Sequence, residues 1–320
     1  MDNLTHSLVG WAIGQAGAKR MTRKGLAALI LGANMPDIDV FFGWAPWAPL
    51  ATHRGFTHGL VGGVLLMPPL LAGLLWLLDR WQVSRGAVFQ SGLAMHFGRL
   101  VALSYLGAVT HPLLDWQTTY SVQLLSPLSN RWYHTDTLFI IDVWIWLMLG
   151  SAIWLSRRRE RRGGRWRAAA SIGIALVGGY IAVNAILTAL AKDAPRVGAP
   201  YAAPETIYAS PGPVLFWRRE LAWRESGTVA WGRYDPFERL LGLTEHTAPV
   251  PTNFADPLVR RALRDPANKA FARWSTMPFA RVERGRCSAR VVFGDARYAR
   301  TVGADRFGGK AVVPIEAPGC

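Results

Sequence analysis

The first 191 residues alternate between hydrophobic blocks and short polar segments. Two blocks are long, because residues 59–78 and 168–191 hold 20 and 24 residues without a charge. A helix needs about 20 predominantly apolar residues to cross the hydrocarbon core of a bilayer. Each of these two blocks is therefore predicted to form a membrane-spanning helix.

Shorter hydrophobic blocks cover residues 3–18, 25–36, 100–114 and 143–156. The first two flank a basic turn at 19–24 and predict a helical hairpin that is fully or partly inserted in the membrane. They are unlike a cleavable signal peptide, because the basic residues follow the apolar block instead of preceding it. Together the blocks predict a mainly α-helical integral membrane domain with about four to six membrane-embedded helices.

Residues 192–320 have a different pattern, with strand-like segments and many prolines near the start. The segments on either side of Ser226 and Gly227 are typical of a β-hairpin. Residues 256–274 predict a helix, and residues 286–299 predict a further pair of strands. We therefore expect a small soluble α+β domain here, after a membrane domain that ends at residue 191.

Composition and charge agree with a membrane protein and suggest its orientation. Hydrophobic residue types make up 51% of the chain, the mean hydropathy is +0.14 and the formal net charge is +15. Seven arginines and one glutamate lie in residues 157–167. Basic residues that flank membrane spans stay in the cytoplasm, so this run is predicted to be cytoplasmic. A basic run can instead bind nucleic acid, but its position between two apolar blocks favours the topological interpretation, and no nucleic-acid partner is expected.

This orientation places the tail domain outside the cytoplasm. The expected location is the bacterial cytoplasmic membrane, crossed several times, with residues 192–320 on the outer side. Cys287 and Cys320, the two cysteines of the chain, could then form a disulfide, because disulfides persist in oxidising compartments. A free, buried pair of thiols is the alternative, and the sequence leaves both open.

Ionisable side chains recur where the hydrophobic blocks end on the predicted outer face. The candidate metal ligands are His6, Asp37, Asp39, His53, His58, His111 and Asp115. Ionisable groups cost roughly 2.5–3.5 kcal/mol each at the centre of a span, so several that converge need a compensating partner. His111 and Asp115 are four residues apart and would project from one helix face. A metal ion could hold this pair, or the two could hydrogen-bond to each other at a helix end.

The other spacings give weaker signals. His53 and His58 are five residues apart, which suggests a loop followed by a first helical turn with Thr57 as a candidate N-cap. Asp37 and Asp39 can face one centre only where a helix has ended. Interfacial histidines and a solvated pair of carboxylates are the alternatives. A mixture of imidazole and carboxylate favours zinc, manganese or iron, and seven ligands exceed the four positions of one zinc, so one to three divalent ions are expected.

These motifs resemble those of a known family. In the order TH, PDID, HRGFTH and HPLLDW they are similar to the bacterial YdjM-like family of membrane-bound, predicted metal-dependent hydrolases. The resemblance covers roughly residues 4–145, and weakly the segments PGPVLFW and FARWSTMPFARV. By residue type and order, the ligand candidates are also similar in part to those of zinc-dependent phospholipase C and P1-type nucleases. Those enzymes use further His and Glu ligands on a late helix, where this chain has His134, Asp136 and Asp142.

The resemblance implies a membrane-bound hydrolase that acts on an ester or phosphoester, with membrane phospholipids among the candidates, at the outer face of the cytoplasmic membrane. Asp39, Arg54 and Asp136 are the candidate catalytic residues. An aspartate could orient the attacking water, and Arg54 could bind an anionic oxygen through two hydrogen bonds. Arg54 could instead anchor the chain at lipid headgroups. The alternative function is a non-enzymatic membrane protein with a structural metal site and a tail domain that binds a partner.

Overall fold

The computed structural model describes residues 1–41, 53–197, 203–300, 308–315 and 320. By its internal contacts the chain divides into two compact units. Unit 1 comprises Met1–Asp39 and Arg54–Ala185, and unit 2 comprises Val40–His53 and Ile186–Cys320. Each unit is described by itself below.

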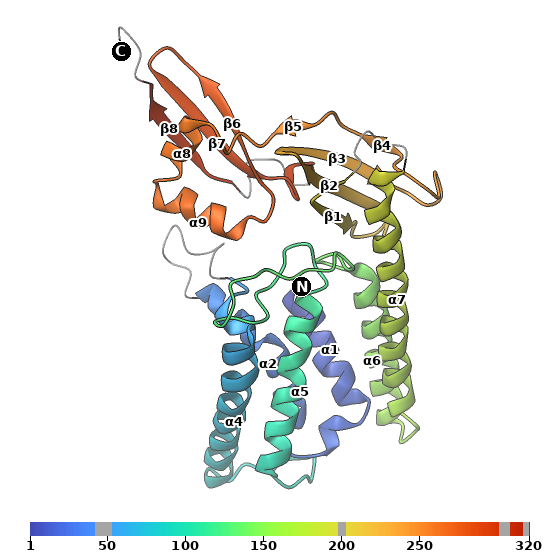
Figure 1. Cartoon of the computed structure of the whole chain (residues 1–320). Coiled ribbons are helices and arrows are strands. Elements are labelled where there is room, and N and C mark those ends of the chain that lie inside the picture. Colours follow the sequence, from blue (N-terminus) through green and yellow to red (C-terminus); the bar gives the residue numbers. More distant parts are fainter. Residues whose placement is uncertain (42–52, 198–202, 301–307, 316–319) are drawn as a thin grey trace. The chain divides into compact units, whose positions relative to one another are not determined.

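Unit 1 is built of helices that run side by side in Figure 1, and each hydrophobic block predicted from the sequence contains one. The long helices are α1 (Asn3–Gln15), α2 (Gly25–Asn34), α4 (Met67–Ser84), α5 (Phe97–Asp115), α6 (Val143–Arg161) and α7 (Arg167–Asp193). Shorter helical segments are η1 (Ala18–Arg20), η2 (Met35–Phe41), η3 (Phe56–His58) and η4 (Leu60–Leu66). Within the described residues, two stretches are long and apolar enough to cross a membrane, Leu60–Ser84 and Arg167–Arg196. The structure therefore supports two of the four to six expected membrane helices.

Glycines bring α2 and α5 into close contact. A Cβ atom added to Gly107 of α5 would lie 2.5 Å from the Leu29 carbonyl oxygen of α2, and one added to Gly32 of α2 would lie 2.8 Å from the Ser104 carbonyl oxygen of α5. Both contacts are with backbone, which cannot move aside as a flexible side chain could. Small residues allow helices to pack closely in membranes, so these glycines set the spacing between two helices that carry the site described below.

The basic turn between α1 and α2 is held by acidic partners on other helices. Arg23 donates two hydrogen bonds of 2.7 Å to Asp79 of α4, and Lys19 Nζ lies 2.5 Å from Glu160 Oε2 of α6. Asp79 is 1% exposed, and a buried carboxylate without a partner would be strongly destabilising. The turn therefore has a structural role as well as the topological one that its charge suggests.

The described residues of unit 2 form two antiparallel sheets and two short helices. The larger sheet consists of β1 (Thr206–Pro211), β2 (Arg219–Glu225), β3 (Thr228–Tyr234), β4 (Glu245–His246) and β5 (Val250–Pro251). Its β2 and β3 form the predicted hairpin, in which Glu225 pairs with Thr228 next to the turn. The smaller sheet has the order β6 (Pro278–Arg284), β7 (Ser288–Asp295) and β8 (Lys310–Pro314). The helices α8 (Pro257–Ala262) and α9 (Pro266–Trp274) lie between the two sheets in the sequence.

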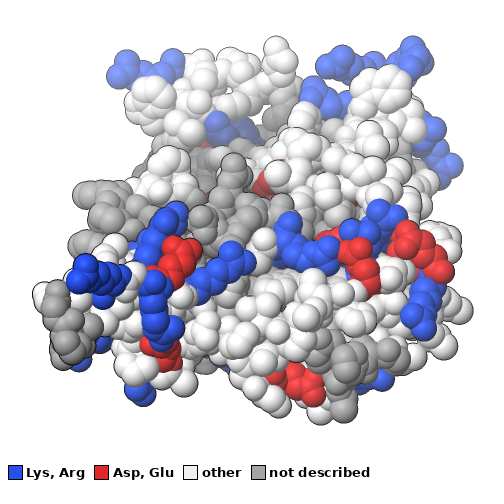
Figure 2. Space-filling model, turned by 90° about the horizontal axis from the view of Figure 1, so that it is seen from above, with Lys and Arg blue, Asp and Glu red and all other residues white. Residues whose placement is uncertain are grey.

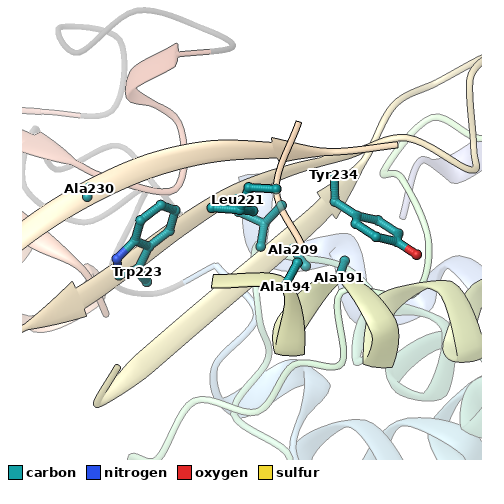
Figure 3. Close-up of a cluster of buried hydrophobic side chains, with 8 residues drawn as sticks. Ala191, Ala194, Ala209, Leu221, Trp223, Ala230 and Tyr234 are labelled. Atoms are coloured by element: carbon teal, nitrogen blue, oxygen red, sulfur yellow. The ribbon is translucent and has the colours of Figure 1, made fainter. Parts of the chain in front are cut away.

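The end of α7 and the turn that follows it pack on the larger sheet within unit 2. Ala191 and Ala194 share a buried cluster with Leu221 and Trp223 of β2 and Tyr234 of β3 (Figure 3). Leu221 and Trp223 are two residues apart and so project from the same face of their strand. The last apolar helix therefore contributes directly to the core of this unit.

One prediction for the tail differs from the structure. Residues 286–299 were expected to form a pair of strands, but they contain the single strand β7, which pairs with β6 and β8. The strand runs from Ser288 to Asp295 without an internal turn, so the chain has no place to reverse within it. Residues 256–274, which were expected to contain a helix, hold α8 and α9, and Asp265 caps α9 through the backbone nitrogens of Ala267 and Asn268.

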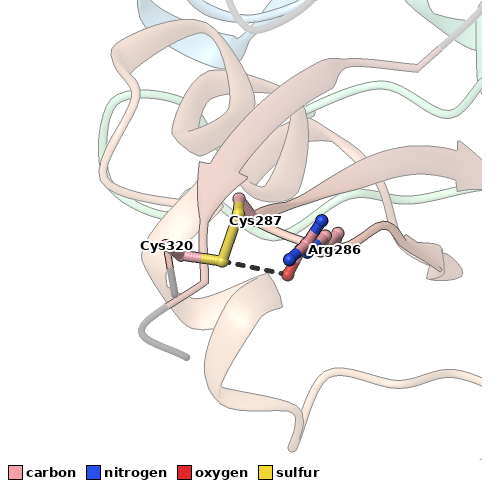
Figure 4. Close-up of a disulfide and its surroundings, with 3 residues drawn as sticks. All are labelled: Arg286, Cys287 and Cys320. Carbon is pink, nitrogen blue, oxygen red and sulfur yellow. Dashed lines mark hydrogen bonds between the residues drawn. A yellow bond between two sulfur atoms is a disulfide. The ribbon is translucent and has the colours of Figure 1, made fainter. Parts of the chain in front are cut away.

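Cys287 and Cys320 are joined by a disulfide (Figure 4). The bond links the start of β7 to a residue 33 positions later, with the two Cα atoms 5.2 Å apart. The Cys320 sulfur also lies 3.2 Å from the Arg286 carbonyl oxygen. Of the two states that the sequence left open, the structure has the disulfide.

Ion pairs connect the charged side chains of unit 2. Arg233 Nε lies 3.1 Å from Glu220 Oε1, and Arg300 Nη2 lies 2.6 Å from Glu245 Oε1. The hydrogen bond from Arg300 lowers the pKa of the Glu245 carboxyl. Several acidic side chains lie beside Lys or Arg on the face shown in Figure 2. Acidic neighbours therefore neutralise part of the positive charge of this unit.

Candidate metal centre

Four buried side chains from three segments of unit 1 converge on one point. They are Asp37 of η2, His58 of η3, and His111 and Asp115 of α5. The spacing of four residues places His111 Nε2 3.3 Å from Asp115 Oδ2. Helix α2 ends at Asn34, and η2 then turns Asp37 toward the same point. Each residue offers one ligand atom, and these atoms all lie within 4.8 Å of one another.

The separations that involve the two histidine nitrogens are close to those expected around a tetrahedral metal ion. The Nε2 atoms of His58 and His111 are 3.0 Å apart. Asp37 Oδ1 lies 3.2 and 3.4 Å from these two nitrogens, and Asp115 Oδ2 lies 3.4 and 3.3 Å from them. Zinc–nitrogen and zinc–oxygen bonds of about 2.0–2.1 Å at tetrahedral angles put neighbouring ligand atoms about 3.3–3.4 Å apart. The set therefore fits one divalent cation.

Hydrogen bonds on the far side of both imidazole rings favour metal binding. His111 Nδ1 donates to the Ala33 carbonyl oxygen at 2.6 Å, so its Nε2 presents a lone pair in the neutral ring. His58 Nδ1 faces the Thr57 hydroxyl at 3.0 Å and Asp39 Oδ2 at 3.3 Å. Two lone pairs and two carboxylate oxygens thus point at one another, and a cation would remove their repulsion.

Asp37 is negatively charged at neutral pH in this environment. Burial raises the pKa of its carboxyl, but the His111 and His58 imidazoles beside it outweigh burial and hold the pKa well below its ordinary value. An ionised carboxylate beside two imidazoles is a ligand set that suits zinc, manganese or iron. The charge at this position therefore agrees with a cation site.

The two oxygens of Asp115 face different partners. Oδ1 lies 3.2 Å from Arg54 Nη2 and also contacts the amino group of Met1. Oδ2 has no hydrogen-bond partner within the described part of the chain and faces the two histidines. One oxygen is thus fixed by positive charge, which leaves the other to ligate a metal.

Arg54 is an internal residue. Its side chain is 2% exposed, and its Nη1 donates a 2.8 Å hydrogen bond to Thr118 Oγ1. The guanidinium also lies over the Tyr120 ring, 4.8 Å from the ring centroid. The interpretation of Arg54 as a headgroup anchor is therefore wrong, because the side chain does not reach the surface. Arg54 instead orients Asp115.

Asp39 lies on the opposite side of His58 from the four donor atoms. Its Oδ2 accepts hydrogen bonds from Thr57 Oγ1 at 2.7 Å and from the Arg54 backbone nitrogen at 3.2 Å. A carboxylate that holds the second nitrogen of a ligating histidine fixes its tautomer and orientation. The expected N-cap role of Thr57 is wrong, because no side chain caps η3 and the hydroxyl bonds to Asp39 instead.

His6 lies against the cluster without being one of its four residues. Its ring stacks on His111 with the centroids 3.8 Å apart, and its Nε2 lies 3.5 Å from Asp115 Oδ1. Among the described residues, neither ring nitrogen has a hydrogen-bond partner. A buried imidazole in this state is placed to contact a further ion or a water molecule.

The remaining predicted site residues are not among the four donors. His53 belongs to unit 2. His134 Nδ1 lies 2.9 Å from Asp136 Oδ1, and neither residue is part of the four-residue group. Asp142 caps α6 through the backbone nitrogens of Trp144 and Ile145. The aspartate at 142 therefore has a structural role.

Sequence reasoning did not identify two residues that support this site. The Ala33 carbonyl oxygen and Thr118 hold His111 and Arg54 through the hydrogen bonds given above. A backbone carbonyl carries no residue-type signal, so the first could not have been found from the sequence. Thr118 follows Asp115 by three residues, and its hydroxyl donates to the Asp115 carbonyl oxygen at 2.8 Å. The three-residue spacing from Asp115 was the one signal in the sequence that could have identified Thr118.

Apolar helices around a buried histidine–aspartate cluster define a helical membrane protein with a candidate metal centre. The sequence model of the YdjM inner membrane protein family matches residues 1–190, more than half of the chain. The chain belongs to this family, and the resemblance seen in the sequence motifs is confirmed. No curated protein and no solved structure matches the chain. The hydrolase activity and the likeness to phospholipase C and P1-type nucleases stay predictions.

Proposed function

We propose that the chain is a metal-dependent hydrolase of the cytoplasmic membrane that cleaves an ester or phosphoester at the outer face. The observation that carries the proposal is the convergence of Asp37, His58, His111 and Asp115 in a buried cluster with near-tetrahedral donor spacing. A divalent metal bound there would activate water as a nucleophile at neutral pH and polarise the ester oxygen. Membrane lipid is the proposed partner, and phospholipids and other phosphoesters are the first substrates to test.

The residues around the four donors have distinct roles in this proposal. Arg54 holds Asp115 Oδ1, so that Oδ2 keeps its direction during the reaction. Asp39 and Thr57 hold the His58 ring from its Nδ1 side. His6, with both ring nitrogens available within the described structure, is the candidate to accept a proton from water or to hold a second ion. Asp136, the third predicted catalytic residue, pairs with His134 and is not one of the four donors.

The proposed topology places the metal centre and the tail domain on the outer side, with four to six helices in the membrane. Two features support it. The arginine run ends α6, at the opposite end of that helix from Asp142 and the loop that follows α5 (Figure 1). The disulfide in unit 2 suits an oxidising compartment. Reporter fusions after Arg162 should then report the cytoplasm, and fusions at Asn130 should report the outside.

The test of the activity uses purified full-length protein supplied with zinc or manganese. It should release the headgroup from a phospholipid in a defined panel of phosphoesters and carboxylic esters, and a chelator should abolish this release. His58→Ala should be inactive while it stays folded, and the exposed His96→Ala should match the unmodified protein. Activity that survives chelation, or that His58→Ala retains, would contradict the proposal.

One observation favours a second function, a membrane protein with a structural metal site. Four protein donors are enough to fill a tetrahedral zinc shell, and closed shells are typical of structural sites. X-ray absorption spectroscopy of the zinc-loaded protein separates the two functions. A shell with a water ligand supports the hydrolase, and a shell of four protein ligands supports the structural role.

A further inference from the structure

A second site lies in unit 1, at the end of α6 that carries the arginine run. A pocket of about 520 Å³ lies between α1 and α6. Leu8, Ile153 and two tryptophans give it an apolar wall, and its other wall consists of Arg157, Arg158, Arg161 and Arg162. The pocket is therefore amphipathic, with a hydrophobic part and a strongly basic part.

The four arginines lie on one side of α6. They stand at helix positions i, i+1, i+4 and i+5, and such positions form a continuous surface. Arg159, in the middle of the same run, is exposed and is not part of the pocket wall. Arg159 therefore differs in position from the four arginines of the pocket wall, although all five belong to the same run.

The positive charge of this wall is not neutralised by the described part of the protein. Arg157, Arg158, Arg161 and Arg162 form no ion pair with any residue in the described ranges. The nearest acidic residue in the run, Glu160, is paired with Lys19 Nζ at 2.5 Å. Four cations around one pocket with no acidic lining residue favour an anionic ligand.

Two tryptophans hold part of this wall in place. The Arg157 guanidinium lies 5.3 Å from the centre of the Trp11 ring, and that of Arg158 lies 5.3 Å from the Trp154 ring. Cation–π contacts of this kind restrict the guanidinium groups. Fixed arginines present a directed set of hydrogen-bond donors to an anion.

We propose that this pocket binds one anionic phospholipid, with the headgroup phosphate on the arginines and the start of an acyl chain on the apolar wall. The charge selects an anion, and the adjoining Leu8 and Ile153 surface selects an anion that carries a hydrocarbon chain. Basic pockets between membrane helices have this chemistry. The site is separate from the metal centre, and the proposal does not depend on hydrolase activity.

Native mass spectrometry of the full-length protein in detergent, titrated with phosphatidylglycerol or with phosphatidylcholine, tests the proposal. The protein should retain phosphatidylglycerol in preference to phosphatidylcholine. The Arg157→Gln/Arg161→Gln variant should weaken phosphatidylglycerol binding by about 10- to 30-fold, given the contribution of each basic residue to binding of anionic lipid. Arg157→Lys/Arg161→Lys should restore most of the binding, and Arg159→Gln is the matched control that should leave it unchanged.

Three outcomes would overturn the proposal. Equal retention of both lipids would show that charge does not select the ligand. An equal loss in Arg159→Gln would show that the arginines attract lipid as a diffuse charge without a site. Displacement of the lipid by an equal concentration of inorganic phosphate would assign the pocket to the free anion. Arg158→Gln/Arg162→Gln provides a second variant with exposed substitutions if the first pair does not yield folded protein.

Discussion

Each unit of this protein buries a group of charged side chains. The two groups differ in how completely the side chains within each group pair with one another. In unit 2, Arg297 donates to both oxygens of Asp295, from Nε at 2.9 Å and from Nη2 at 2.7 Å. Ser275 Oγ adds a hydrogen bond of 2.5 Å to the same carboxylate, and the Trp274 ring covers the guanidinium at 4.8 Å. The Asp295 carboxylate raises the pKa of Arg297 against the effect of burial. This group is complete without a ligand.

The cluster in unit 1 has the opposite character. Its Asp37, His58, His111 and Asp115 direct four acceptor atoms at one point. Arg54 and the Met1 amino group bind Asp115 at Oδ1, and Oδ2 has no hydrogen-bond partner among the described residues. The comparison teaches that burial of charge does not by itself indicate a ligand site. A ligand site is indicated where buried acceptor atoms point at one another and no hydrogen atom lies between them.

The largest expected effect is the loss of bound metal when a ligand of the unit 1 cluster is replaced. His111→Ala removes one of the four ligand atoms. Loss of an outer-shell partner lowers metal affinity about 10- to 100-fold, and loss of a direct ligand should lower the bound metal by more than this. Plasma mass spectrometry of desalted protein measures this. The matched control is His96→Ala, which is exposed in the same unit. Unchanged metal in His111→Ala would remove the distinction between the two clusters.

The second effect concerns stability in unit 2. Asp295→Ala leaves Arg297 buried without its partner, which should lower the free energy of unfolding by about 3–5 kcal/mol. Urea denaturation followed by tryptophan fluorescence measures the loss, and the metal content should not change. Asp193→Ala is the control, because its ion pair with Arg196 is exposed and should contribute little. A loss of metal in Asp295→Ala would show that the two groups are coupled.

The smallest expected effect distinguishes the four ligands of unit 1 from a residue that supports one of them. Asp39→Asn keeps all four donor atoms but weakens the support of the His58 ring, so metal affinity should fall by about 10- to 100-fold. Competition with a chromogenic chelator measures the affinity. If Asp39→Asn abolished binding as fully as His111→Ala does, Asp39 would be a direct ligand, as the sequence predicted.

How much the sequence could predict depends on how local each feature is. His111 and Asp115 lie on one helix, so their spacing was enough to predict that they face one centre. Asp37 and His58 come from other segments, and their distances to α5 depend on the packing of α2 and the turn at Gly55, which residue types alone do not determine. Arg54 looked like a surface residue because it is a charge in a polar segment, yet its backbone adopts a φ of 64° and its side chain is buried.

The predictability of the fold follows the same rule. Hydrophobic blocks predicted the helices well, because helix formation depends on nearby residues. Strand pairing in the tail was predicted correctly only for β2 and β3, which a two-residue turn joins. Of the two partners of β7, β6 ends at Arg284, close before β7 begins at Ser288, but β8 begins at Lys310, 15 residues after β7 ends. Pairing over such a distance leaves no pattern in the sequence.

Gly107 has a consequence beyond the packing of two helices. It lies one helical turn before His111, and the Nδ1 hydrogen bond of His111 crosses to the Ala33 carbonyl oxygen on α2. Any change that pushes α5 away from α2 therefore lengthens this bond and rotates the imidazole at the same time. The distance between α2 and α5 and the orientation of the His111 ring therefore change together. A single methyl group added at residue 107 should be detected as a change in metal affinity.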